Sequence, residues 1–184
     1  MPSHSATPLS PAPPAGASSP LAASAAARRR VATALKAERV VQFDDFVAAF
    51  RAGPMERVGW IKAGMPADYA VFVAREMNIP KERLFGTLGL ARATVDRKVR
   101  ERRLLSRDES AMLLGAARLV GQVQAMVEES GEPEGFHAAE WVAGWLERPL
   151  PALAGRRPAE LMDTAEGQAI VANLLDRTRT GAYA

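Results

Sequence analysis

The chain has 184 residues, with 24 Lys and Arg against 21 Asp and Glu, which is enough for one ordinary domain or two small ones. It contains no cysteine, so a disulfide framework, a thiolate zinc site and an iron–sulfur cluster are all excluded. Its two histidines, His4 and His137, are too few for a histidine-built metal site, and no run of 18 uncharged apolar residues predicts a membrane span. We therefore expect a cytoplasmic protein without a metal or cofactor.

The small net charge of +3 conceals an uneven distribution along the chain. Residues 1–30 carry three arginines and no acidic residue, and residues 81–107 carry nine basic against three acidic residues. Residues 108–184 carry six basic against twelve acidic residues. A basic middle and an acidic C-terminal part indicate two different partners.

Residues 1–30 consist mainly of Pro, Ala and Ser, with no aromatic residue. Such a segment cannot bury enough apolar surface to offset the entropy of ordering, so we expect a disordered leader. An acid-free start with arginines is also typical of an organelle transit peptide. Six prolines among the first 20 residues disfavour the amphipathic helix that such a peptide needs.

From about residue 38 onward, apolar residues recur at spacings of three and four, and no sustained alternation appears, so an all-α fold is predicted. Gly53-Pro54, Gly64 and Pro66 divide the first part into three helices, with Pro66 at the first helical position of the third. The apolar residues of these helices are Phe43, Phe46, Val47 and Phe50, then Val58, Trp60 and Ile61, then Tyr69, Phe72, Val73 and Met77.

The window from Lys81 to Arg100 has the pattern of a helix-turn-helix. Gly89 provides the left-handed residue of the turn, and one departure from the usual pattern is Phe85-Gly86, where a small residue normally precedes a larger one. The residues predicted to dock the two helices are Leu84, Phe85, Leu88, Leu90, Val95 and Val99.

The exposed face of the second helix in this window is predicted to bind DNA. Arg92 and Arg97 can each donate two hydrogen bonds to guanine, and Thr94 can contact a base or a phosphate. Lys98, Arg100, Arg102 and Arg103 suit the phosphate backbone. The alternative is that this basic face is simply solvated.

A long helix is predicted after Ser106, because Ser106 and Glu109 have the spacing of a capping box. It runs to about Ser130 before Gly131, so its length is about 36 Å. A further helix covers Phe136 to Glu147, with Trp141 and Trp145 one turn apart on the same face of this helix. The last helix begins near Asp163 or Thr164, with Asp163 and Glu166 spaced as in a capping box, and its predicted buried stripe is Ile170, Val171, Leu174 and Leu175.

These boundaries predict a leader at 1–30, a helix-turn-helix domain at 38–105, and a long helix with a small C-terminal domain at 106–184.

The C-terminal segment carries two distinctive motifs. One reads Pro158-x-Glu160-Leu161-Met162-Asp163-Thr164-x-Glu166-Gly167, and the other is the terminal Gly181-x-Tyr183-Ala184. They resemble the toxin-binding domain of Xre/MbcA/ParS-type antitoxins, and the resemblance extends over roughly residues 60–184. It implies an antitoxin that represses its own operon and neutralises a partner toxin, often of the RES class that consumes NAD or transfers ADP-ribose, with the tail at or near the toxin's active site.

The residues predicted to bind the toxin are Arg177, Arg179, Gly181, Ala182, Tyr183 and Ala184. The tail is narrow enough to enter a cleft, Tyr183 offers an aromatic anchor, and the two arginines can pair with acidic residues of a toxin. An acidic domain would also complement a basic partner. The alternative is that the tail is a frayed chain end that binds no partner.

No nucleophile, metal site or acid–base constellation can be assembled from these residues, so we do not expect an enzyme. We expect a homodimer, because operator half-sites mirror a two-fold axis. The alternative function is a stand-alone helix-turn-helix regulator whose C-terminal domain binds a small ligand or another protein.

Overall fold

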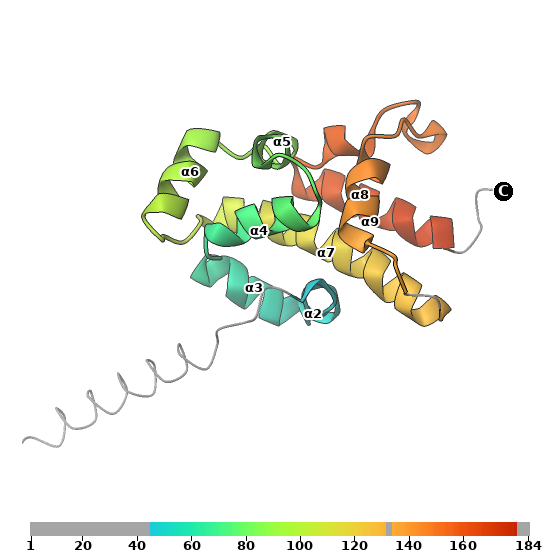
Figure 1. Ribbon diagram of the computed structural model, residues 1–184, viewed down its shortest axis with the longest axis horizontal. Helices are drawn as coiled ribbons and strands as arrows, with labels where there is room; N and C mark the ends of the chain where they lie inside the picture. The colour runs from blue at the N-terminus through green and yellow to red at the C-terminus, as the bar shows by residue number, and fades with distance from the viewer. Residues whose placement is uncertain (1–44, 132–133, 180–184) are drawn as a thin grey trace, which may run out of the picture. The chain divides into compact units, whose positions relative to one another are not determined.

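The computed structural model describes residues 45–131 and 134–179 of the chain, and these residues fold into helices (Figure 1). The predicted all-α class is confirmed, since the described residues contain only an isolated bridge between Pro66 and Leu104 in place of a sheet. The predicted leader, Phe43 and the tail after Arg179 lie outside the described residues. The helices are α2 (Phe46–Arg51), α3 (Pro54–Ala63), α4 (Asp68–Glu76), α5 (Lys81–Thr87), α6 (Arg92–Arg100), α7 (Arg107–Ser130), α8 (Ala138–Leu146), the 3₁₀ turns η1 (Pro151–Leu153) and η2 (Pro158–Leu161), and α9 (Ala165–Arg179).

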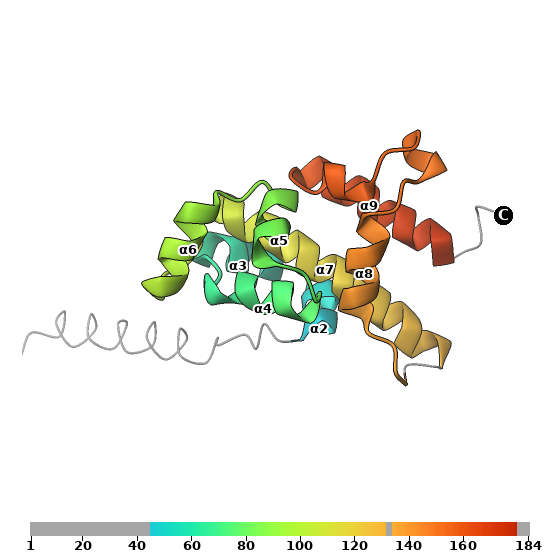
Figure 2. The ribbon, with the colours of Figure 1, turned by 45° about the horizontal axis from the view of Figure 1, so that its top comes forward.

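Helix α7 is the predicted long helix, and its start has the predicted capping box. The hydroxyl of Ser106 accepts a hydrogen bond from the Glu109 N–H at 3.2 Å, and the Ser106 N–H donates to the Glu109 carboxylate at 2.6 Å. At the other end, Gly131 adopts a left-handed conformation with φ 86°, which ends the helix. Helices α2, α3, α8 and α9 all pack against α7, which therefore organises the core (Figure 2).

Helix α7 is long and apolar enough to cross a membrane by length and composition alone. More than half of its most apolar stretch is buried against the other helices, as in the core helix of a folded domain. Its fully buried residues include Leu113, Ala117 and Val120. The apolar character of α7 is therefore explained by packing.

Close approach of α2 to α7 depends on Gly121. A Cβ atom at position 121 would lie 1.9 Å from the main-chain oxygen of Phe46. Phe46 and Val47 are buried in this contact, as their spacing predicts. Only a glycine lets the two backbones approach so closely.

Three local predictions differ from the structure. Helix α4 begins at Asp68, because Pro66 lies in the bridge with Leu104 instead of opening the helix. Ile170 is exposed, with 42% of its surface accessible, since the buried stripe of α9 is narrower than the sequence pattern indicates. The start of α9 is capped by Thr164, whose hydroxyl accepts a hydrogen bond from the Gly167 N–H at 3.0 Å, and not by a box formed by Asp163 and Glu166.

Candidate functional site

The basic segment folds into two short helices joined by a tight turn. Helices α5 and α6 are connected by Leu88 to Ala91, and Gly89 in this turn has φ 65°, as predicted. The Leu90 N–H donates to the main-chain oxygen of Phe85 at 2.8 Å. The side chains of Leu84, Phe85, Leu88, Leu90 and Val95 are buried, and Val99 is half-buried. The two helices therefore pack as one unit that leaves one side of α6 in solvent.

The exposed side of α6 carries most of the predicted DNA-binding cations. Arg97 and Arg100 lie one turn apart on this side, together with the small residue Ala93. Arg102 and Arg103 follow the helix and are exposed as well. Thr94 is half-buried, so it lies at the margin of the surface.

Arg92 lies at the start of α6 and is already engaged by carboxylates. Its guanidinium is 3.1 Å from Glu82 and 3.7 Å from Asp96, although the side chain remains 64% exposed. Asp96 also accepts a hydrogen bond from Lys81 at 2.5 Å. That hydrogen bond, together with the charges of Lys81, Arg92 and Arg100, holds the pKa of Asp96 below its usual value, so the carboxylate stays ionised beside the arginine.

Lys98 has a different environment from the other predicted cations. Its ammonium group pairs with the carboxylate of Glu109, and its side chain is only 15% exposed. Burial disfavours the ionised form of Glu109, but the hydrogen bonds from Lys98 and Ser106 outweigh this effect and hold its pKa below the usual value. Lys98 therefore connects α6 to the first turn of α7. Sequence spacing gave no indication of this pair, because it joins two different helices.

The C-terminal motif forms a corner where η2 leads into α9. Pro158 and Met162 are buried, and Thr164 caps α9. A Cβ atom at position 167 would lie 1.9 Å from the main-chain oxygen of Leu161, so Gly167 permits the tight corner. The next residue, Gln168, donates from its side-chain amide to the main-chain oxygens of Met162 at 2.9 Å and Met112 at 3.0 Å. The motif therefore fixes the position of α9 against α7.

Acidic residues near this corner are held by Arg157. Its guanidinium lies 3.1 Å from Glu160 and 3.1 Å from Glu147, which joins η2 to the end of α8. The hydrogen bond to Glu160 and the charge of Glu147 raise the pKa of Arg157, and the same hydrogen bond lowers the pKa of Glu160. The carboxylate of Glu160 therefore remains charged at the surface of the corner.

The sequence of this region matches a known protein family. Residues 122–181 match the antitoxin Xre/MbcA/ParS C-terminal toxin-binding domain, and this range includes the C-terminal end of α7 together with α8, η1, η2 and α9. The chain is also 45% identical to the Prs ADP-ribosylating antitoxin of Sphingobium sp. (strain YBL2) over 140 residues, covering 76% of this chain and 87% of the relative. The chain belongs to the Xre/MbcA/ParS-type antitoxin family.

This antitoxin carries its predicted toxin-binding residues at and beyond the end of α9. Arg177 is exposed in the last part of this helix. The side chain of Arg179 and residues Gly181, Ala182, Tyr183 and Ala184 lie outside the described part of the chain, so their assignment stays a prediction.

The antitoxin has two candidate surfaces: the basic surface of α6 and the end of α9. They lie toward opposite ends of α7. Glu109 in its first turn holds α6, whereas Gln122 donates to the main-chain oxygen of Ala172 in α9 at 3.1 Å. Positions 109 and 122 are about 20 Å apart along a helix. Since Gln168 contacts Met112 and Ala172 contacts Gln122, α9 runs in the same direction as α7 and ends still farther from α6. The basic surface and the end of the toxin-binding domain are thus separate.

Proposed function

We propose that this antitoxin neutralises an ADP-ribosylating or NAD-consuming toxin of the RES type and represses its own operon. The main support is the 45% identity to a relative named Prs ADP-ribosylating antitoxin, which extends over most of both chains. That name associates the relative with ADP-ribosylation, and the match to the toxin-binding domain supports a cognate toxin as partner. The protein acts by binding and does not itself catalyse a reaction.

Toxin binding is assigned to the C-terminal domain within residues 106–184. The assigned residues all lie in the stretch 177–184 at the end of this domain: Arg177, Arg179, Gly181, Ala182, Tyr183 and Ala184. Its helical part is anchored to α7 through Gln168 and Gln122, which gives the stretch a rigid base. A rigid base reduces the entropy lost on binding.

DNA binding is assigned to α6 within residues 38–105. The exposed positions of Arg97, Arg100, Arg102 and Arg103 favour contact with phosphates and base edges. Arg92 would exchange its contacts with Glu82 and Asp96 for DNA, and Thr94 would contribute at the margin. Lys98 would act mainly by fixing α6 on α7 through Glu109, and its phosphate contact would be secondary. A homodimer would present two such helices to two half-sites.

Removal of residues 181–184 tests the toxin assignment. We expect the truncated protein to lose protection of cells against the product of the neighbouring toxin gene while still binding the DNA upstream of its own gene. Lys62→Ala, at an exposed position of α3 outside both assigned surfaces, is the control and should preserve protection. Full protection by the truncated protein would contradict the role of the tail.

Combined replacement of Arg92 and Arg97 by Ala tests the DNA assignment. We expect the gel shift of the upstream DNA to be lost, and co-purification with the toxin to be retained. Arg148→Ala, at an exposed position after α8, is the control. An unchanged gel shift in the double variant would show that α6 does not contact DNA.

A further inference from the structure

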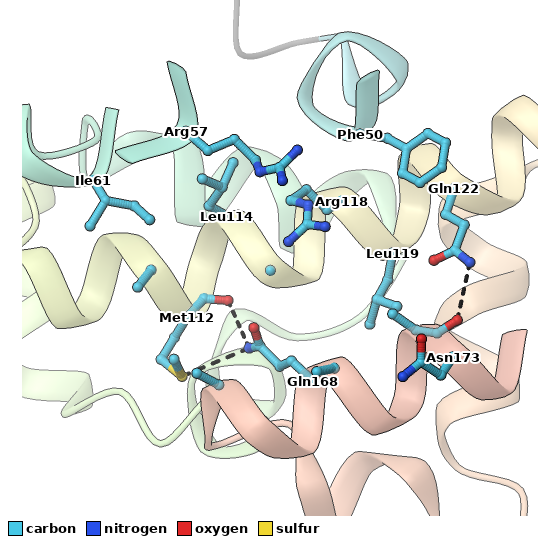
Figure 3. Close-up of a pocket in the computed structure, with 15 residues that line it drawn as sticks. Phe50, Arg57, Ile61, Met112, Leu114, Arg118, Leu119, Gln122, Gln168 and Asn173 are labelled. Carbon is cyan, nitrogen blue, oxygen red and sulfur yellow. Dashed lines mark hydrogen bonds between the residues drawn. The ribbon is translucent and has the colours of Figure 1, made fainter. Parts of the chain in front are cut away.

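A groove of about 340 Å³ lies between α3, α7 and α9, outside both surfaces assigned above (Figure 3). One wall is apolar and includes Phe50, Ile61 and Leu119. The opposite wall belongs to α9, where Gln168 and Asn173 face the space. The groove therefore combines an apolar wall with polar side chains, as small-molecule sites do.

Two arginines from different helices converge in this groove. Arg57 of α3 and Arg118 of α7 extend toward one another, and both line the space (Figure 3). Burial and the charge of Arg57 lower the pKa of Arg118. Two like charges have thus been brought together in a partly desolvated place, which costs free energy unless an anion is present.

No carboxylate among the described residues lines the groove or pairs with these two guanidinium groups. Arg57 donates a hydrogen bond to the main-chain oxygen of Ala52. The Nε atom of Arg118 is buried and has no hydrogen-bond partner in the described part of the chain. Buried donors are nearly always paired, so an unpaired donor on a cation indicates a missing acceptor.

We propose that this groove binds a small molecule that carries a phosphate group. Guanidinium groups match phosphate oxygens with paired hydrogen bonds, and two guanidinium groups can balance the double charge of a phosphate monoester. A volume of about 340 Å³ accommodates a small phosphate ester whose apolar part lies against Phe50 and Leu119. The bound phosphate would join α3 to α7 beside α9, and so connect the N-terminal helices to the toxin-binding domain.

The test measures binding of AMP, inorganic phosphate and adenosine to the full chain by calorimetry and by the shift in melting temperature. We expect AMP and millimolar phosphate to bind and to raise the melting temperature, and uncharged adenosine to do neither. Arg118→Met should reduce AMP affinity about tenfold or more, because a hydrogen bond to a charged group is lost. The melting temperature of the free Arg118→Met protein should be unchanged or higher, since a partly buried cation without an anionic partner is removed.

Two control variants locate the bound anion. Arg97→Ala combined with Arg100→Ala removes cations of α6 and should leave AMP binding unchanged, as should Arg148→Ala. Loss of AMP binding in the α6 variant but not in Arg118→Met would overturn the proposal. So would equal binding of adenosine and AMP, or the absence of binding by both phosphate probes. If Arg118→Met weakened toxin capture while neither phosphate probe bound, the occupant would be an acidic side chain of the toxin, and the small-molecule proposal would be wrong.

Discussion

The side-chain amide of Gln168 in α9 donates to the main-chain oxygen of Met112 in α7 at 3.0 Å. The same amide donates to the main-chain oxygen of Met162 at 2.9 Å. One buried side chain therefore fixes both the corner before α9 and the position of α9 against α7. Gly115 makes this possible, because a Cβ atom there would lie 1.6 Å from the Gln168 side-chain oxygen. The toxin-binding domain is therefore oriented by a specific polar contact as well as by apolar packing.

Replacement of Gly115 by Ala should displace the Gln168 amide. Its hydrogen bonds to Met112 and Met162 would be broken or distorted, which leaves buried carbonyl groups without this donor. We expect the free energy of unfolding to fall by about 1–3 kcal/mol, as measured by urea denaturation. Gly144→Ala is the matched control, because nothing lies within 4 Å of a Cβ atom at that exposed helical position. The control should be neutral or more stable by about 0.5–1 kcal/mol, and equal effects of the two changes would contradict the role given to Gly115.

Replacement of Gly121 by Ala should separate α2 from α7. The new methyl group would meet the backbone oxygen of Phe46 at 1.9 Å, and a backbone cannot move aside as a side chain can. We expect a loss of about 2–4 kcal/mol in the free energy of unfolding, since α2 must shift and the buried Phe46 and Val47 lose contacts. Gly59→Ala, in α3 with open space around its Cβ position, serves as the control. If both variants melt at the temperature of the unmodified protein, the close contact is not needed.

The sequence predicts the helices of this antitoxin well because their signals are local. The spacing of Ser106 and Glu109 marks the start of α7, and Gly131 marks its end. Gly89 marks the turn between α5 and α6. Each signal acts within a few residues, so a single sequence is enough to find it. The two C-terminal motifs likewise indicate the family before any contact is known.

Contacts between distant residues could not be predicted in this way. Ile170 follows the helical stripe of α9 but is exposed, because only the side that carries Val171 and Leu174 is buried. Lys98 pairs with Glu109, which belongs to another helix and lies 11 positions along the chain. The convergence of Arg57 and Arg118 depends on how α3 packs on α7. No sequence spacing encodes these relationships, which follow from tertiary packing.

The pair formed by Lys98 and Glu109 should make stability depend on pH. Because the pKa of Glu109 is lower in the folded protein than its usual value of 4.5, its contribution is complete above about pH 4.5 and is lost as the pH falls through the folded pKa. Glu109→Gln should reduce the free energy of unfolding by about 2 kcal/mol at neutral pH. The difference from the unmodified protein should shrink on acidification below pH 4.5, as followed by urea denaturation at several pH values.

The exposed Glu140 provides the control for this pH dependence. Glu140→Gln should leave the shape of the stability profile unchanged. A constant difference between the Glu109→Gln variant and the unmodified protein from pH 7 to pH 3 would show that the Glu109 charge does not stabilise the contact between α6 and α7.

The exposed cations of α6 should determine how DNA binding depends on salt. Each phosphate contact releases counterions, so the logarithm of the binding constant falls with the logarithm of salt concentration by about 0.9 for each contact. Arg97→Ala and Arg100→Ala together should weaken binding and reduce this slope by about 2 if both residues contact phosphate. If Arg97 reads a base instead, the slope should fall by about 1, while discrimination between the upstream DNA and unrelated DNA decreases. Lys98→Met should leave the slope almost unchanged, because its ammonium group is held by Glu109, and a slope reduced as much as in the double variant would place Lys98 on the DNA after all.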